Sequence, residues 1–132
     1  MRVFLDTVGL VAVWNRADQW HAAAKLAFTE IARLDSDYVT TTFVLLECGN
    51  AAARKVFRKD ALALKDSLEA EGRLVVPTQT DWDSAWAAYR RGEADQAGIV
   101  DHVSFAVMRR VGITQAFTND RHFRAAGFTT LF

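Results

Sequence analysis

The sequence has one cysteine, one proline and no net charge across its 132 residues. A single cysteine excludes a disulfide within the chain and favours a reducing compartment. The balanced charge means that a nucleic-acid partner would need a local basic patch. No apolar run approaches the roughly eighteen residues that a membrane helix requires. Asp6 interrupts the apolar N-terminus, and no cleavage-site pattern follows, so we expect a cytoplasmic protein without a membrane partner.

The residues that are present are those of an ordinary globular protein. About half are apolar and a quarter are charged, and 132 residues are enough for one domain with a real core. The sequence contains no internal repeat, linker or low-complexity segment. We therefore expect one domain over residues 1–132.

Short β-branched and aromatic runs alternate with segments that have apolar residues at helical spacing. The expected strands are 2–6, 37–42, 73–77, 114–118 and 128–132. The expected helices are 7–16, 19–34, 43–59, 60–72, 80–93 and 99–112, with a loop at 94–98 and one or two helical turns at 120–127. This alternation predicts an α/β fold with three layers, in which helices flank a central, mostly parallel five-stranded sheet.

Several helix ends carry capping residues. Thr7 and Asp60 are suitable N-caps for the helices 7–16 and 60–72. Gly72 and Gly112 are suitable stops, because glycine readily adopts the left-handed conformation that ends many helices.

Four acidic residues fall where a parallel sheet usually binds its ligands. Asp6 ends the first strand and Asp120 follows the fourth, so their carboxylates converge if these strands are neighbours. Asp101 opens the helix before the fourth strand. Glu47 lies in the otherwise apolar turn "VLLEC", and acids are seldom buried without a partner.

Each aspartate alone also has a simpler interpretation. Asp6 could end a strand as a turn or helix cap, Asp101 could be an N-cap with Ser104 three residues later, and Asp120 could cap the last helical turn. The functional interpretation rests on all four acids meeting in one pocket.

Converging carboxylates need a cation. Two of them about 4 Å apart repel by roughly 4 kcal/mol at an effective dielectric of about 20. An all-oxygen ligand set favours Mg²⁺, with Mn²⁺ as a substitute. No C-x-x-C or H-E-x-x-H spacing suggests zinc. Such an ion suits phosphoryl chemistry.

Four segments, "FLDT", "LLE", "VDHVSFAVMRR" and "FTNDRHF", resemble the motifs of PIN-domain nucleases. They resemble most closely the VapC-like ribonuclease toxins of toxin–antitoxin pairs. The resemblance implies a PIN-like domain and a Mg²⁺-dependent endoribonuclease whose metal site is Asp6, Glu47, Asp101 and Asp120. It also implies an RNA substrate, whether tRNA, rRNA or mRNA, a small cognate antitoxin and a homodimer.

Other residues take supporting places by the same resemblance. Four lie beside the acids in the motifs: Thr7, Asn50, Ser104 and Thr118. Two positions depart from the family pattern, because Val8 and Val100 stand where the family often has small polar residues. Loss of such hydroxyls can weaken metal binding by about ten- to a hundredfold.

Basic and aromatic clusters are the remaining features. Arg121 and Arg124, with Arg54 in "ARKVFRK", are the candidates for RNA phosphates, although solvated helix faces are the simpler interpretation. His102 and His122 could act near the site, although surface or core histidines are the simpler interpretation. The aromatic residues of the helix 80–93 suggest core or dimer packing in preference to base stacking, and those of the first helices suggest core or an antitoxin groove: Trp82, Trp86 and Tyr89; Trp14, Trp20 and Phe28.

Two other functions fit the same sequence. One is a PIN-type nuclease of RNA processing or DNA metabolism that has no antitoxin. The other is a catalytically weakened domain that binds RNA or protein, which the two valines favour.

Overall fold

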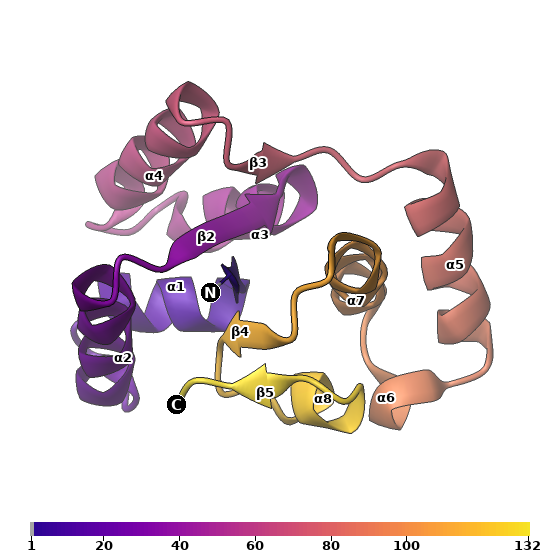
Figure 1. Cartoon of the computed structure of the whole chain (residues 1–132). Helices are drawn as coiled ribbons and strands as arrows, with labels where there is room; N and C mark the ends of the chain where they lie inside the picture. Colours follow the sequence, from indigo (N-terminus) through magenta and orange to yellow (C-terminus); the bar gives the residue numbers. More distant parts are fainter. Residues whose placement is uncertain (1) are drawn as a thin grey trace.

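The computed structural model describes residues 2–132 and shows one sheet among helices (Figure 1). Of the expected domain, only Met1 lies outside the description. The five strands, in the spatial order β3-β2-β1-β4-β5, all pair in parallel. They are β1 (Arg2–Leu5), β2 (Asp37–Thr41), β3 (Leu74–Val75), β4 (Gln115–Phe117) and β5 (Thr129–Thr130). The predicted α/β fold class is confirmed.

The helices of residues 2–132 connect these strands and cover the sheet (Figure 1). They are α1 (Thr7–Trp14), α2 (His21–Arg33), α3 (Thr42–Ala52), α4 (Arg58–Ala70), α5 (Gln79–Arg90), α6 (Glu93–Gln96), α7 (Ile99–Val111) and α8 (Arg121–Ala125). In this part of the chain, no helix is both long and apolar enough to cross a membrane.

The central strand β1 carries the first candidate acid at its end. Val3, Phe4 and Leu5 are fully buried, as expected for a strand covered on both faces. Phe4 lies opposite Val39 of β2 on one side and Ala116 of β4 on the other. The predicted neighbourhood of the first and fourth strands is therefore correct, and their carboxyl ends share one edge of the sheet.

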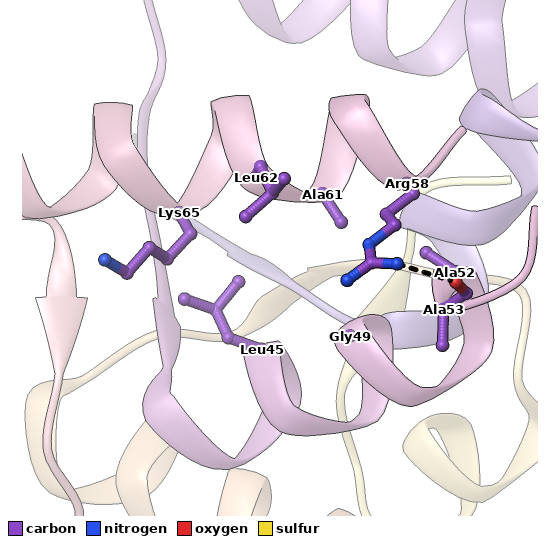
Figure 2. Close-up of a pocket in the computed structure, with 8 residues that line it drawn as sticks. All are labelled: Leu45, Gly49, Ala52, Ala53, Arg58, Ala61, Leu62 and Lys65. Atoms are coloured by element: carbon purple, nitrogen blue, oxygen red, sulfur yellow. Dashed lines mark hydrogen bonds between the residues drawn. The ribbon is translucent and has the colours of Figure 1, made fainter. Parts of the chain in front are cut away.

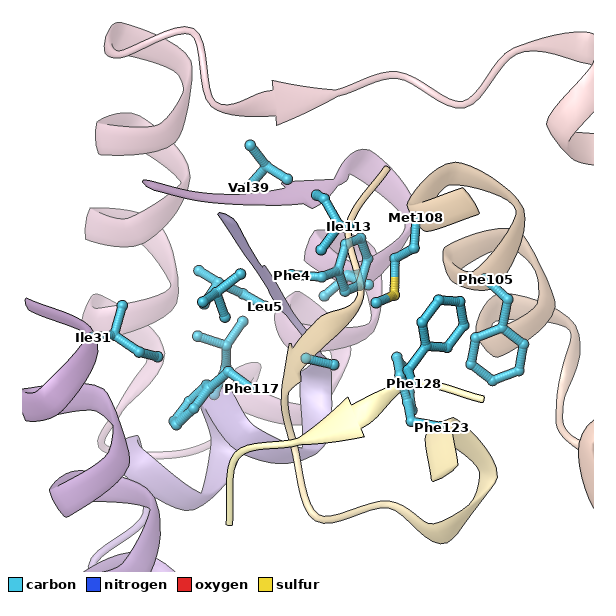
Figure 3. Packing of buried hydrophobic residues seen from close by; sticks show 14 of the residues in the cluster. Phe4, Leu5, Ile31, Val39, Phe105, Met108, Ile113, Phe117, Phe123 and Phe128 are labelled. Atoms are coloured by element: carbon cyan, nitrogen blue, oxygen red, sulfur yellow. The ribbon is translucent and has the colours of Figure 1, made fainter. Parts of the chain in front are cut away.

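Aromatic packing fixes α7 and α8 against this edge (Figure 3). Phe105 of α7 packs against Phe123 of α8, with ring centroids 4.9 Å apart and planes at 86°. Phe128, which leads into β5, lies 5.6 Å from the Phe105 ring. The edge-to-face pair of Phe105 and Phe123 stabilises the packing beyond its buried area. The helices that bear Asp101 and Asp120 are thus held in place by the core.

Gly9 allows α1 to lie close to the end of β4. A Cβ atom at this position would be 2.2 Å from the carbonyl oxygen of Phe117. Only glycine fits such a close approach between a helix and a strand backbone. The contact brings the start of α1 beside the end of β4.

An ion pair between the buried Asp81 and the partly exposed Arg110 joins α5 to α7. The Asp81 side chain accepts two-pronged hydrogen bonds from Arg110, at 2.8–3.2 Å. Asp81 also accepts from the backbone N–H of Thr78 in a capping box at the start of α5. The hydrogen bonds from Arg110, supported by those from Thr78, hold the pKa of Asp81 below its ordinary value, against the opposing effect of burial.

Two predicted helix boundaries are wrong. The helix expected over 43–59 ends at Ala52, and α4 begins at Arg58 with Phe57, not Asp60, at its N-cap. Phe57 is buried and its ring lies 6.4 Å from that of Trp14 on α1. This packing breaks a segment whose local pattern is continuously helical. Gly72 and Gly112 end their helices as predicted, with φ of 68° and 78°.

The segment expected as a loop at 94–98 contains the short turn α6. Ala94, Asp95 and Gln96 have φ between 53° and 58°. Consecutive non-glycine residues in this left-handed region are strained. Hydrophobic periodicity has no signature for such a turn, so the prediction could not include it.

Candidate active site

Asp6 caps a helix and also belongs to the candidate active site. It is the N-cap of α1 and accepts a hydrogen bond from the backbone N–H of Val8 at 3.4 Å. Its Oδ2 also accepts from the hydroxyl of Thr118 at 2.8 Å, and the side chain is buried. The cap interpretation of Asp6 is thus correct, whereas the predicted N-cap role of Thr7 is wrong.

Thr7 instead links α1 to α3. Its hydroxyl donates to Oε1 of Glu47 at 2.7 Å. The bond crosses 40 residues of sequence and holds the Glu47 carboxylate at the start of α1, where its charge acts on Asp101.

Asp101 lies in the first turn of α7 and is not its cap. The N-cap is Gly98, so the prediction of Asp101 as an N-cap is wrong. Its carboxylate is therefore free to face the other acids. Ser104, one turn further on, is fully buried, and its hydroxyl has no hydrogen-bond partner within residues 2–132.

Asp120 caps α8, as its simpler interpretation predicts. Its Oδ1 accepts from the backbone N–H of His122 at 2.9 Å. Its own backbone N–H donates to the Thr118 hydroxyl at 3.1 Å. Thr118 therefore connects Asp6 and Asp120 directly.

His122 lies at the site, a position that the sequence analysis gave only as its less favoured interpretation. Its Nδ1 lies 2.9 Å from Oδ1 of Asp120. One ligand atom from each of Asp101, Asp120 and His122 lies within 4.8 Å of the others. The sequence feature that could have indicated this is the position of His122, two residues after Asp120. Both the backbone N–H and Nδ1 of His122 lie within hydrogen-bonding distance of the Asp120 carboxylate.

Electrostatic coupling joins the four acids. Burial, then the charges of Asp101 and Asp120, raise the pKa of Asp6 to about 8, against the opposing hydrogen bond from Thr118. Burial, then the charges of Asp120 and Glu47, raise the pKa of Asp101 to about 7. The chain therefore concentrates more negative charge here than it can neutralise.

The donor set fits a divalent ion. Ligand atoms of Asp101, Asp120 and His122 all lie within 4.8 Å of one another, close enough for one ion to contact all three after small side-chain movements. Oxygen donors dominate the site, as Mg²⁺ and Mn²⁺ prefer. An ion would also relieve the repulsion that raises these pKa values.

The other predicted residues lie at varying distances from this cluster. Asn50 is exposed on α3, and Arg54 is exposed in the turn after α3. Arg121 is exposed and forms an ion pair with Asp95 at 3.4 Å. Arg124 donates to the Asn119 carbonyl and the Thr130 hydroxyl, so it also connects α8 to β5.

The comparison with protein families agrees with this geometry. The PIN-domain family matches residues 3–129. The chain belongs to the PIN-domain family. Its four acids lie in the segments whose resemblance to PIN motifs is described above.

A similar PIN-domain protein is known by sequence and by structure. The chain is 30% identical over 131 residues to the 23S rRNA-specific endonuclease VapC20 of Mycobacterium tuberculosis, covering 96% of this chain and 95% of that protein. The crystal structure of VapC20, described as a sarcin–ricin loop cleaving toxin, matches with a TM-score of 0.79 at 28% identity, over 96% of each chain.

More distant structures share the fold alone. VapBC2 from Rickettsia felis, bound to a DNA fragment from its promoter, matches with a TM-score of 0.66 at 15% identity, over 98% of this chain and 97% of that one. FitAcB from Neisseria gonorrhoeae matches with a TM-score of 0.63 at 17% identity, over 100% and 97%.

Proposed function

We propose that this PIN domain, residues 1–132, is a metal-dependent endoribonuclease that acts as the toxin of a toxin–antitoxin pair. The observation that carries the proposal is the acid cluster of Asp6, Glu47, Asp101 and Asp120, in which burial and the neighbouring carboxylates raise the pKa of Asp6 and of Asp101. The similarity to VapC20 over 96% of the chain supports RNA as the substrate.

In this proposal the acids divide the work of holding Mg²⁺ or Mn²⁺. Asp6 and Asp101 hold the principal ion, and Glu47 and Asp120 complete its shell. A bound ion supplies activation of water and neutralisation of the phosphodiester charge. Thr118 orients Asp6 through its 2.8 Å hydrogen bond, and Thr7 orients Glu47 at 2.7 Å.

Basic residues next to the cluster would hold the RNA backbone. Arg121 directly follows Asp120, and its ion pair with Asp95 is exposed. Exposed pairs contribute little, about 0–1 kcal/mol, so a phosphate can compete for the guanidinium. Arg124 and Arg54 are further phosphate candidates, with Arg124 already oriented by its bonds to Asn119 and Thr130.

The test is cleavage of defined RNAs by purified protein with Mg²⁺ or Mn²⁺. The substrates are rRNA, tRNA and mRNA fragments, and we expect rRNA to be cut because VapC20 is named for that activity. Asp6→Asn and Asp101→Asn should abolish cleavage while circular dichroism shows an intact fold. Asp66→Asn, at an exposed acid of α4, is the matched control and should cleave normally.

Two results would change the conclusion. If the Asp101→Asn variant cuts RNA at the wild-type rate, the site assignment is wrong. If the wild type binds Mn²⁺ but cuts none of the RNAs, the chain is a binding domain and not a nuclease.

This chain has a groove that suits the antitoxin implied by the resemblance. A hollow of about 310 Å³ lies between α3 and α4 (Figure 2). Gly49 and three alanines leave room on its floor, Leu45 and Leu62 provide apolar walls, and Arg58 and Lys65 lie at its edge. We propose that an antitoxin segment with an apolar anchor and acidic neighbours docks here.

The groove proposal can be tested with a small protein encoded beside this one. Gly49→Phe should weaken binding of that small protein by about a hundredfold or more, because the phenylalanine ring would occupy the part of the groove where the apolar anchor docks. A Cβ atom at Gly49 meets nothing within 4 Å, so the fold should tolerate the change. Unchanged binding in calorimetry would place the antitoxin elsewhere.

A further inference from the structure

A polar hollow lies between α6, α7 and α8. Its volume is about 210 Å³, and it is lined by Glu93 from α6, by His102, Phe105 and Arg109 from α7, and by the end of α8. Pockets for drug-sized ligands usually have about 300–1,000 Å³, so this one suits a smaller group. We call it the α6–α8 pocket.

His102 brings an unpaired polar atom to this pocket. The side chain is 2% exposed, and its Nε2 has no hydrogen-bond partner among residues 2–132. The ring is held by two aromatic neighbours, Tyr89 and Phe105, with centroids 6.4 Å and 5.5 Å away. Because a buried nitrogen without a partner is unfavourable, a ligand that forms a hydrogen bond with Nε2 would be favoured here.

Arg109 supplies hydrogen-bond donors beside His102. One of its Nη groups donates to the Ala126 carbonyl at 3.0 Å, and the guanidinium lies 5.2 Å from the centre of the Phe128 ring. These contacts hold the guanidinium in place, and no carboxylate pairs with it within residues 2–132. Its remaining N–H groups can therefore donate to an acceptor in the pocket.

Glu93 supplies hydrogen-bond acceptors from α6. Its Oε2 pairs with Arg91 in an exposed ion pair, and exposed pairs contribute little. A ligand can therefore compete for this carboxylate. Ala94, which also lines the pocket, begins the left-handed turn at 94–96. Backbone strain of this kind collects at ligand-binding positions.

The three polar groups match the edges of one nucleobase. A carboxylate can accept two hydrogen bonds side by side, and guanine has two adjacent donors on its base-pairing edge, N1–H and the N2 amino group. Guanine O6 and N7 are acceptors that arginine commonly binds. Adenine and cytosine place an acceptor next to their amino group, and uracil has one donor between two acceptors. Guanine is therefore the base that fits this set.

The pocket borders the acid cluster. His102 directly follows Asp101 in α7, and α8, whose end lines the pocket, begins directly after Asp120. With five residues, α8 is only about 7.5 Å long. A base next to a phosphate that lies at the acids is therefore within reach of the pocket.

We propose that the α6–α8 pocket binds an unpaired guanine of the RNA substrate. Glu93 accepts from N1–H and the N2 amino group, Arg109 donates to N7, and Nε2 of His102 donates to O6. Proteins commonly read single-stranded RNA by such contacts to the edges of unstacked bases. This inference rests on the proposed nuclease function and adds a base preference to it.

Titration calorimetry in EDTA tests the pocket without metal and without cleavage. The probes are guanosine, adenosine, cytidine and uridine monophosphates, which share one phosphate group, so any preference comes from the base. The guanosine nucleotide should bind about tenfold more tightly than the other three, because each of those leaves a polar group of the pocket unpaired.

Two variants test the groups that bind the base. Glu93→Gln should lower the affinity for guanosine monophosphate about tenfold, because an amide offers one acceptor oxygen where guanine presents two donors. His102→Phe keeps an aromatic ring between its neighbours and should lower the same affinity about threefold or more. Glu71→Gln, at an exposed acid paired with Arg73, is the control and should bind as the wild type does. Thermal unfolding checks that each variant is folded.

Inosine places the base in the RNA. Inosine lacks the N2 amino group of guanosine and keeps N1–H, O6 and N7. Replacing the recognised guanosine by inosine should lower kcat/KM about tenfold for the wild type. For Glu93→Gln the loss should be less than about threefold, because the contact is already impaired. Each guanosine near the cleaved bond is replaced in turn.

Two results would overturn the proposal. They are a guanosine nucleotide that binds no more tightly than the other three, and an affinity for it that Glu93→Gln leaves unchanged. If the protein still cuts RNA in either case, the pocket assignment alone is wrong. If the protein binds guanosine monophosphate through Glu93 but cuts no RNA, the nuclease function alone is wrong.

Discussion

The hydroxyl of Thr118 lies 2.8 Å from the Asp6 carboxylate, although 112 residues separate the two in sequence. The same hydroxyl accepts the backbone N–H of Asp120 at 3.1 Å. One side chain at the end of β4 thus positions the acid of the central strand and the acid that caps α8. The acid cluster depends on this junction between the first and fourth strands.

Thr118→Val should weaken Mn²⁺ binding by about ten- to a hundredfold, because Asp6 loses the group that orients it. It should also lower the free energy of unfolding by about 1–3 kcal/mol, since the Asp120 N–H loses its acceptor. Calorimetric titration with Mn²⁺ and urea unfolding measure the two effects. Thr118→Ser keeps the hydroxyl and should retain both properties; a valine variant with wild-type affinity would refute the positioning role.

Without metal, the protein should become less stable as the pH rises from about 4 to 8. The pKa of Asp6 rises on folding from 3.8 to about 8, and that of Asp101 to about 7. In this range the folded state binds more protons than the unfolded state, so raising the pH favours unfolding. Thermal unfolding in EDTA at pH 5, 6, 7 and 8 should show a melting temperature that falls by several degrees.

Two comparisons check that these acids cause the pH effect. Asp6→Asn removes one of the titrating groups and should flatten the slope. Adding Mg²⁺ at pH 8 should raise the melting temperature of the wild type more than that of the variant. A wild-type melting temperature that rises with pH would contradict the assignment.

His122→Gln should reduce the preference of the site for Mn²⁺ over Mg²⁺. The imidazole lies in the same cluster of ligand atoms as Asp101 and Asp120, and nitrogen donors favour transition metals over Mg²⁺. Titration calorimetry with each ion should show the affinity ratio falling by about tenfold. His21→Gln is the control, because His21 bonds the Ala12 carbonyl instead; an equal loss in both variants would exclude a specific role.

Two glycine-to-alanine changes should have opposite effects on stability. Gly9→Ala puts a Cβ atom 2.2 Å from a backbone oxygen of Phe117 and should cost about 1–3 kcal/mol. Gly49→Ala lies within α3 with open space around it and should add about 0.5–1 kcal/mol. Urea unfolding of both variants measures this, and a stable Gly9→Ala protein would show that α1 can shift away from β4.

The order of strands and helices was accessible from sequence because each strand is a short apolar run between amphipathic helices. The boundaries that failed depend on distant contacts. The local sequence of residues 53–57 does not indicate that Phe57 packs beside Trp14. The interruption of the helix at these residues could therefore not be predicted. The left-handed turn at Ala94–Gln96 likewise has no glycine to mark it.

The site was predictable where chain topology alone decides position. Asp6 and Asp120 follow strands that proved to be neighbours, so their proximity follows from strand order. The inclusion of His122 depends on a side-chain rotation toward Asp120, which periodicity cannot predict. The exposure of Trp82 and Trp86 could not be predicted either, because two alanines and Asp81, not the tryptophans, form the buried face of α5.

The central place of β1 has a consequence for how the protein is made. Its β4 partner and the Thr118–Asp120 turn are translated more than a hundred residues after Asp6. A growing chain therefore lacks half of its acidic centre, Asp101 and Asp120, until the segment that carries them has emerged from the ribosome. Any cleavage activity must therefore wait for synthesis of the segment that carries Asp120.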